Sequence, residues 1–512
     1  MTKKSFWILT ISLVVVKLLI HFLTSTNYEL HRDEMLYFTM GSHLSWGFAS
    51  TPPLMSFLSF LIKCLFGYHE FYVKLFPALA GASILLLIAL SVRELGGGLF
   101  AVFTGCLGFL ISTAMLRSSS LFMPVIFELF FWTLLLFFLL RLVHRQDPRY
   151  WTAIGISFGL AFLNKYSVLF LGFSVFAAIL ISEHRRLLLS KYLFYGILAA
   201  LIIMLPNILW QINHKFPVIT HMSELYRTQL NYVSKQTFLL EQVLMNIASI
   251  LIWITGFIVL LFSKPAKKFR LFAYILLLVV FLFLVSKGKP YYTLGAYPIL
   301  FAFGGYFLEK NFTGKMALVA RGMVIYSFLT SLFLVPMGLT VLPRQKMADY
   351  CAFFSKYVTK APMRNENNEY TPLPQDYMDM SGWNEMAGLV AVAYNRLDSL
   401  QQKDCILFAN NYGQAGALDF YGKKYHLPDA VSVNDSYIFW APDSLVAHNF
   451  IVTDGHLGDI PRLFNQYTVI GEINDPYSRE NGLKVFLCQN PTPLLNDFFK
   501  KRIRAHKAIY GY

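Results

Sequence analysis

The sequence predicts an α-helical polytopic membrane protein that ends in a small α/β domain. Of the 512 residues, 56% are hydrophobic and only 14% are charged, whereas an ordinary soluble domain carries about 25% charged residues. The apolar residues come in repeated runs of roughly 18 or more, which is the length of a helix that crosses a bilayer. These runs stop near residue 343, and the remainder shows the strand and helix patterns of a soluble domain.

The apolar runs and the basic residues between them predict the number and direction of the spans. We expect about eleven transmembrane helices of roughly 20 residues or slightly fewer. They lie near 6–24, 71–92, 99–115, 122–141, 150–163, 166–182, 192–210, 238–262, 271–286, 292–308 and 317–341. The basic clusters are Lys3-Lys4, Arg93, 141–149, 183–186 with Lys191, 263–270 and 309–315. They fall at one end of the helices, which the positive-inside bias assigns to the cytoplasm. The net charge of +15 therefore does not indicate a nucleic-acid partner.

The unusual segments fall at the opposite, extracytoplasmic end. They are loop 25–70, loop 114–122, the turn at 164–165, loop 211–235, the turn 286–298 and the tail. We therefore expect a transmembrane domain over residues 1–342, with a long outer loop at 25–70, and an extracytoplasmic α/β domain over residues 343–512. In that tail, "DCILFANNYGQAGALDFYG" predicts strand, turn and helix, and "NFIVTDG", "YTVIGEI" and "LKVFLC" predict further strands.

The outer loop carries two adjacent carboxylates just beyond the first span, Asp33 and Glu34. A helix from Glu34 to Leu44 would be amphipathic, and the following apolar stretch, 54–67, is too short to span and reads as interfacial or re-entrant. Charges at the end of a span can simply mark the water boundary. A carboxylate pair at the membrane surface is also what general-base catalysis or cation binding requires.

Several basic and tyrosyl residues stand at apolar positions on the same outer side. A lysine at membrane depth is costly, so it either snorkels to the interface or has a function. Several such groups facing one acidic loop suit an anionic group at the bilayer surface, such as a lipid phosphate. The residues are Lys165, Lys287 and Lys289, with Tyr291 and Tyr292 beside them, and Arg117.

Glu128 is a further candidate because it lies inside the apolar run "FMPVIFELFFW". An acid in such a run is expensive unless it faces a cavity or a partner. It is either a boundary residue displaced by one turn or a second carboxylate of the site.

The remaining motifs are less specific. The glycines of "NNYGQAGALDFYGKKY" (410–425) fit a strand-to-helix turn that either stabilises the fold or contacts substrate, and the run is neither a P-loop nor GxGxxG. The five cysteines are odd in number and widely spaced, which indicates neither a disulfide framework nor a zinc site.

Eight segments match, in order, the motifs of one family. They are "RDEMLYFTMGSHLSWGFASTPPL", "ELGGGLFA", "FELFFWTLLLFFLLR", "GLAFLNKYSVLFL", "LPNILWQINHKFP", "KGKPYYTLGAYPILFAFGGY", "SGWNEMAGLVAVAYN" and "NNYGQAGALDFYGKKYHLP". On these segments the chain resembles the polytopic glycosyltransferases of the C-type fold (family 39-like). It is most similar to the bacterial relatives of protein O-mannosyltransferases and of the lipid A aminoarabinose transferase.

The resemblance implies a hexosyl or pentosyl transferase of the bacterial inner membrane. Its donor would be a polyprenyl-phosphate sugar and its acceptor an extracytoplasmic lipid, glycan or protein. Asp33 would be the catalytic base, with Glu34 beside it, and would drive attack on the anomeric carbon with inversion. Hydrogen-bond donors at fixed positions would stabilise the departing phosphate, whose charge grows in the transition state. The resemblance implies that these hydrogen-bond donors are Lys165, Lys287, Lys289 and Tyr292.

The sequence departs from the family pattern in two places. Ser50-Thr51 precedes the double proline, where the family often has a carboxylate, His or Lys, and Met123-Pro124-Val125 stands where it often has Asp before Pro. A divalent metal therefore stays an open possibility. Two other classes also stay open, a lipid or glycan transporter or flippase, and a catalytically degenerate membrane scaffold. The outer α/β domain and the one-sided placement of the candidate residues argue against a transporter.

Overall fold

The described residues of the computed structural model, 1–366 and 369–510, form two compact units. The helical unit comprises Met1–Ser25, Lys74–Ile208 and Tyr226–Val341. The mixed unit comprises Thr26–Val73, Leu209–Leu225 and Leu342–Tyr512. The outer loop, which the sequence prediction grouped with the transmembrane domain, thus packs with the tail instead.

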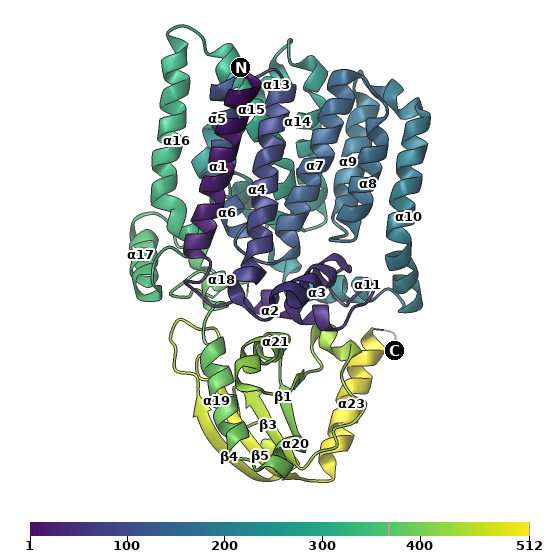
Figure 1. The fold of residues 1–512 in the computed structure, drawn as a ribbon, viewed down its shortest axis with the longest axis vertical. Helices are drawn as coiled ribbons and strands as arrows, with labels where there is room; N and C mark the ends of the chain where they lie inside the picture. The colour runs from purple at the N-terminus through teal and green to yellow at the C-terminus, as the bar shows by residue number, and fades with distance from the viewer. Residues whose placement is uncertain (367–368, 511–512) are drawn as a thin grey trace. The chain divides into compact units, whose positions relative to one another are not determined.

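The helices of the helical unit run along a common direction (Figure 1). Among the described residues, six helices are long and apolar enough to cross a membrane, or seven if a pair bent by 56° counts as one span. The six are α1 (Lys3–Thr24), α4 (Glu70–Glu94), α7 (Pro124–Arg145), α10 (Lys191–Asn213), the stretch Lys267–Val285 that contains α14 (Leu271–Val285), and α16 (Met316–Gly338). The bent pair is α12 (Lys235–Leu244) with the stretch Ile247–Phe262 that contains α13 (Ile250–Phe262). The chain is a multi-pass membrane protein.

The prediction of about eleven spans is not confirmed, because several expected spans are short or broken helices. The helices α5 (Leu99–Leu110), α8 (Tyr150–Phe162) and α9 (Val168–Ile181) have 12 to 14 residues. At 1.5 Å per residue they extend only about 20 Å, against about 30 Å of bilayer hydrocarbon. The span expected at 292–308 is divided into a 3₁₀ helix, η6 (Pro290–Ala296), and α15 (Pro298–Asn311).

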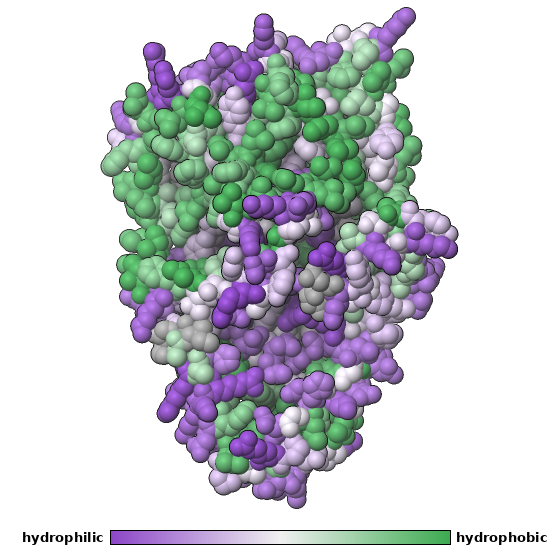
Figure 2. Space-filling model, turned by 180° about the vertical axis from the view of Figure 1, so that it is seen from behind, coloured by the Kyte–Doolittle hydropathy of each residue, from purple (hydrophilic) through white to green (hydrophobic). Residues whose placement is uncertain are grey.

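Glycines allow α15 to pack closely between α5 and α13. A Cβ on Gly304 would overlap the backbone of α13, and one on Gly305 would overlap the backbone of α5. Small residues let helix backbones approach closely. In a membrane this close packing holds helices together, because lipid is as apolar as the side chains and the hydrophobic effect does not drive their association. Figure 2 shows the outer surface of this unit, hydrophobic over a broad band with hydrophilic side chains at one end.

The tail folds around a mixed five-stranded sheet, counted over the described residues, with the order β2-β1-β3-β5-β4. β1 is parallel to β2 and β3, whereas β5 is antiparallel to both β3 and β4. Four of the strands, β1, β3, β4 and β5, lie in the segments that the sequence predicted, whereas the two-residue β2 was not predicted. They are β1 (Cys405–Ala409), β2 (Ala430–Val431), β3 (Asn449–Asp454), β4 (Phe464–Glu472) and β5 (Lys484–Pro491).

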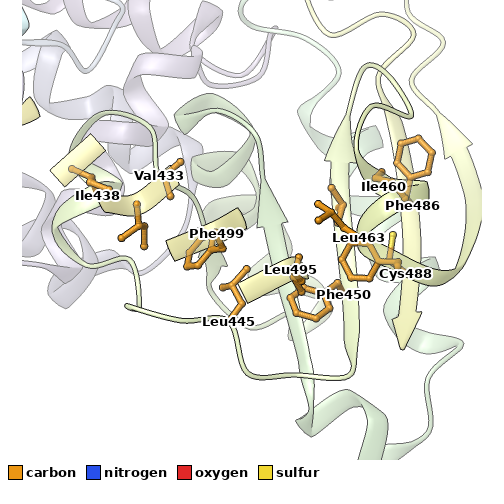
Figure 3. Close-up of a cluster of buried hydrophobic side chains, with 13 residues drawn as sticks. Val433, Ile438, Leu445, Phe450, Ile460, Leu463, Phe486, Cys488, Leu495 and Phe499 are labelled. Atoms are coloured by element: carbon orange, nitrogen blue, oxygen red, sulfur yellow. The ribbon is translucent and has the colours of Figure 1, made fainter. Parts of the chain in front are cut away.

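Both faces of the sheet are buried at β3, whereas the edge strand β4 is largely exposed. Phe450 pairs with Cys488 in adjacent strands, and both belong to the cluster that also contains Leu495 and Phe499 of α23 (Leu494–Ile509) (Figure 3). The other face packs against α19 (Trp383–Asn395). Because successive side chains point to opposite faces, a strand covered on both faces is buried along most of its length, as β3 is.

The outer loop joins the mixed unit through a close contact between two helices. It contains α2 (Arg32–Thr39), a 3₁₀ turn, η1 (Met40–Ser42), and α3 (Leu54–Phe66). α2 packs on α21 (Tyr412–Tyr421). A Cβ on Gly416 would lie only 2.9 Å from Cβ of Met35. The glycine motif of the tail is therefore a packing surface for the loop that carries Asp33.

Candidate active site

The lysine–tyrosine cluster, defined as Lys165, Glu128, Ser167, Tyr291 and Tyr292, lies in the helical unit. Lys165 occupies the turn between α8 and α9, and its Nζ donates to Oε2 of Glu128 on α7 at 2.7 Å. The Ser167 hydroxyl donates to the other carboxylate oxygen. Lys165 Nζ also lies 4.2 Å from the ring centroid of Tyr292 and 5.6 Å from that of Tyr291. The cluster therefore holds one ammonium between a carboxylate and two aromatic rings.

The two charged side chains of this cluster differ in how far they are buried. The Glu128 side chain is 3% exposed, whereas that of Lys165 is 23% exposed. Asn164 fixes the turn, since its Nδ2 donates to the carbonyl oxygen of Pro124 at the start of α7. The buried carboxylate orients Lys165, whose side chain stays partly exposed. These are the contacts of a positioning group, and a catalytic task for Glu128 stays a prediction.

The other predicted phosphate-binding residues lie at varying distance from this cluster. Lys289 immediately precedes η6, which carries Tyr291 and Tyr292. Arg117 belongs to α6 (Thr113–Ser118), which contacts η6. Lys287 instead donates to Oδ1 of Asn231 at 2.7 Å. The structure thus brings Lys165, Tyr291 and Tyr292 together and gives Lys287 a different partner.

Asp33 lies in the first turn of α2 in the mixed unit. The Tyr412 hydroxyl donates to Oδ1 of Asp33 at 2.8 Å, and the guanidinium of Arg32 lies 4.5 Å from the Tyr412 ring centroid. Burial, and then the charge of Asp33, raise the pKa of Tyr412 well above its usual value. The phenol therefore stays protonated and holds the carboxylate in one orientation.

Glu34 has a structural task at the start of the same helix. It is completely buried, and its Oε2 accepts a hydrogen bond from the backbone N–H of His31 at 2.8 Å. His31 Nδ1 in turn accepts from the backbone N–H of Asp33 at 3.1 Å. This reciprocal arrangement is a capping box, which fixes the direction of a helix N-terminus. Glu34 therefore orients the backbone that presents Asp33.

Sequence reasoning missed a buried acid behind this helix. Asp379 lies 3.6 Å from Nε2 of His31 and accepts from Nη1 of Arg479 at 3.2 and 3.3 Å. Burial raises the pKa of Asp379, and the charges of His31 and Arg479 oppose that rise. Asp379 precedes the motif "SGWNEM", but nothing in the one-dimensional pattern joins it to His31. Tyr412 lies within the motif 410–425 that the sequence analysis noted, but nothing in the sequence distinguishes it there from Tyr421 and Tyr425 as a partner for a carboxylate.

The described residues contain no group of three or more His, Cys, Asp or Glu side chains that could hold a metal ion.

The fold is that of a multi-pass membrane protein, in which Lys165 pairs with buried Glu128 and Asp33 accepts a hydrogen bond from Tyr412. Residues 50–210 match the sequence model of the dolichyl-phosphate-mannose-protein mannosyltransferase family. This match includes Glu128 and Lys165, whereas Asp33 lies before it. Over these residues the chain is similar to these glycosyltransferases, which confirms the resemblance inferred from its motifs.

Individual proteins support the same relationship. The lipid A galacturonosyltransferase RgtD of Rhizobium johnstonii is 24% identical over 194 residues, which are 38% of this chain and 41% of that protein. The chain therefore matches about two fifths of the length of this curated relative. Crystal structures of ArnT from Cupriavidus metallidurans, bound to undecaprenyl phosphate and in the apo state, each align with a TM-score of 0.64. They are 14% and 15% identical, cover 94% and 95% of this chain, and are themselves covered over 97% and 98%. At that identity they show the fold.

Proposed function

We propose that this protein is an inverting glycosyltransferase that moves a hexosyl or pentosyl group from a polyprenyl-phosphate donor to an extracytoplasmic acceptor. The observation that carries the proposal is Lys165, a partly exposed lysine whose ammonium is held by buried Glu128 beside two tyrosines. A relative of the same fold was crystallised with undecaprenyl phosphate, which supports a donor of this class. The setting would be a bacterial inner membrane, with the tail outside the cytoplasm and a cell-envelope lipid, glycan or protein as acceptor.

The lysine–tyrosine cluster has to stabilise the negative charge of the phosphate leaving group. The bond between the anomeric carbon and the phosphate oxygen breaks, and its electrons stay on the phosphate. An ammonium fixed in advance stabilises this growing charge more than the ground state, which lowers the barrier. Glu128 keeps Lys165 oriented before the donor arrives, so no reorganisation is needed at the moment of transfer.

The acceptor requires a base. Asp33 takes the proton of the acceptor nucleophile as the nucleophile's oxygen or nitrogen forms its bond to the anomeric carbon from the face opposite the phosphate. The Tyr412 hydroxyl donates to Oδ1 of this carboxylate, which holds the base in one orientation. Configuration inverts because attack and departure occur on opposite faces.

The test is sugar transfer by the purified protein in nanodiscs. The protein is given undecaprenyl phosphate carrying a radiolabelled hexose or pentose, together with an envelope lipid extract. Label should move to a new product with release of undecaprenyl phosphate, and Asp33→Asn should lower the rate by about 10²–10⁴-fold. Asp497→Asn, an exposed carboxylate of α23, is the matched control and should transfer normally.

Two results would count against the proposal. Normal transfer by Asp33→Asn, with thermal stability unchanged, would remove Asp33 as the base. Movement of intact donor across the bilayer, with no transfer to any acceptor, would indicate a flippase instead.

A further inference from the structure

A pocket opens at the end of α2 in the mixed unit, beside α3. Its volume is about 410 Å³. One ammonium and one hydroxyl line it, and its other walls are apolar or backbone. The lining residues are Gly41, Ser42, Leu44, Phe60, Lys63 and Cys64.

Lys63 is the single cation of this pocket. Its Nζ donates to Oγ of Ser42 at 2.6 Å and lies 4.7 and 5.4 Å from the ring centroids of Phe38 and Tyr68. Within residues 1–366 and 369–510, no carboxylate forms an ion pair with it. Burial lowers the pKa of Lys63 to about 8, so the ammonium is still charged at neutral pH. The charges of Asp419 and Asp429 act on the ammonium without forming an ion pair with it, so an anion in direct contact would stabilise it further.

An exposed apolar face adjoins the cation. α3 buries one side within the mixed unit, yet Phe57 and Phe60 on its other side are 51% and 38% exposed. Leu44 and Trp46, before α3 in the chain, are 52% and 55% exposed. An apolar helix face beside a basic residue is typical of a segment that lies in the interface of a bilayer. Because the chain spans a membrane, lipid is the apolar phase available to this face.

We propose that this pocket binds an anionic membrane lipid. Its phosphate pairs with Lys63 and accepts from the Ser42 hydroxyl, and its acyl chains lie against Leu44 and Phe60. Charge complementarity selects the lipid class, because a zwitterionic lipid brings its own cation and gains less from the ammonium. The inference does not depend on sugar transfer, and Lys63 is distinct from the lysine–tyrosine cluster.

The test is lipid binding to the purified full chain in neutral detergent, read by native mass spectrometry. Phosphatidylglycerol and phosphatidylcholine with the same acyl chains are titrated separately. The wild-type chain should hold phosphatidylglycerol about tenfold more tightly, which is the size of one charge-assisted contact. Lys63→Gln should bring the two lipids close to parity, whereas Lys63→Arg should keep the preference.

Two further variants make the result decisive. Ser42→Asp places a carboxylate beside Lys63 without removing it, so it should also abolish the preference, and it carries the test if Lys63→Gln does not fold. Lys424→Gln removes a cation that contacts Asn384 and lies outside the pocket, so it should keep the preference.

Equal binding of both lipids by the wild-type chain would overturn the proposal, as would a preference that survives both Lys63→Gln and Ser42→Asp. Displacement of phosphatidylglycerol by an equal concentration of soluble glycerol phosphate would also overturn it, because the site would then bind a soluble anion.

Discussion

Replacing Lys165 by Met leaves Glu128 without its cation, in a position where the carboxylate is 3% exposed. Removing one partner of a buried pair typically costs about 3–5 kcal/mol, because the remaining charge is left uncompensated. Lys165 itself is 23% exposed, and Glu128 keeps the Ser167 hydroxyl. We therefore expect the lower end of that range, about 3 kcal/mol of unfolding free energy.

The double variant Lys165→Met/Glu128→Leu separates stability from function. It removes both charges and fills the space with apolar atoms, an exchange that is often neutral or stabilising for buried pairs. Its stability should return to within about 1 kcal/mol of the wild type. Donor use should stay impaired, since the ammonium is gone.

The assay is denaturant unfolding of the two single variants and the double variant in one detergent, with transfer measured in parallel. A coupling free energy near 2–3 kcal/mol between the two positions would support the buried pair. Additive effects of the two substitutions would refute it, because the residues would then not interact. Normal donor KM in the stable double variant would refute the task given to Lys165.

The remaining predictions concern the mixed unit and its location. Tyr412→Phe should slow transfer and move the acid limb of the pH–rate profile upward, because a lost hydrogen bond no longer favours the charged form of Asp33; an unmoved limb would contradict this. Gly416→Val should destabilise the mixed unit by more than about 1 kcal/mol through overpacking against α2, and wild-type thermal stability would count against that contact. Burial raises the pKa of Asp419 to about 6, above its unfolded value, so the folded state holds the proton longer. Stability should therefore fall by up to about 3 kcal/mol as pH rises from about 4 to above 6, a slope that Asp419→Asn should flatten in unfolding measurements. A reporter that is active only outside the cytoplasm should work when fused after Tyr512, and activity of a cytoplasmic reporter there would reverse the topology.

The sequence predicted where helices and strands form better than it predicted how long they are. Apolar runs located a helix in each expected span, but run length does not reveal a break in the backbone. The turn at Lys165 divides one apolar region into two short helices, and Pro298 starts α15 only after a 3₁₀ helix. In both cases tertiary packing, which the sequence pattern does not encode directly, decides where the α-helix stops.

The candidate site was predicted as separate residues rather than as contacts. Lys165 and Glu128 were both noted as costly charges in apolar surroundings, yet their pairing spans 37 positions and depends on how α7 packs beside the turn. Glu34 was grouped with Asp33 as a carboxylate pair, and only the backbone geometry shows that it caps the helix. The sequence gives the chemical type of each residue, but it does not give the direction in which the side chain points or the residue that it contacts.

The contact between Asp33 and Tyr412 joins residues 379 positions apart. At translation rates of roughly 5–20 residues per second, α2 emerges from the ribosome about 20 to 80 s before α21 is complete. During that interval the outer loop lacks the surface on which it packs, and its carboxylate has no orienting phenol. The packing of α2 on α21 can therefore form only once α21 has been synthesised, and a chain that terminates before α21 carries Asp33 without the phenol that orients it.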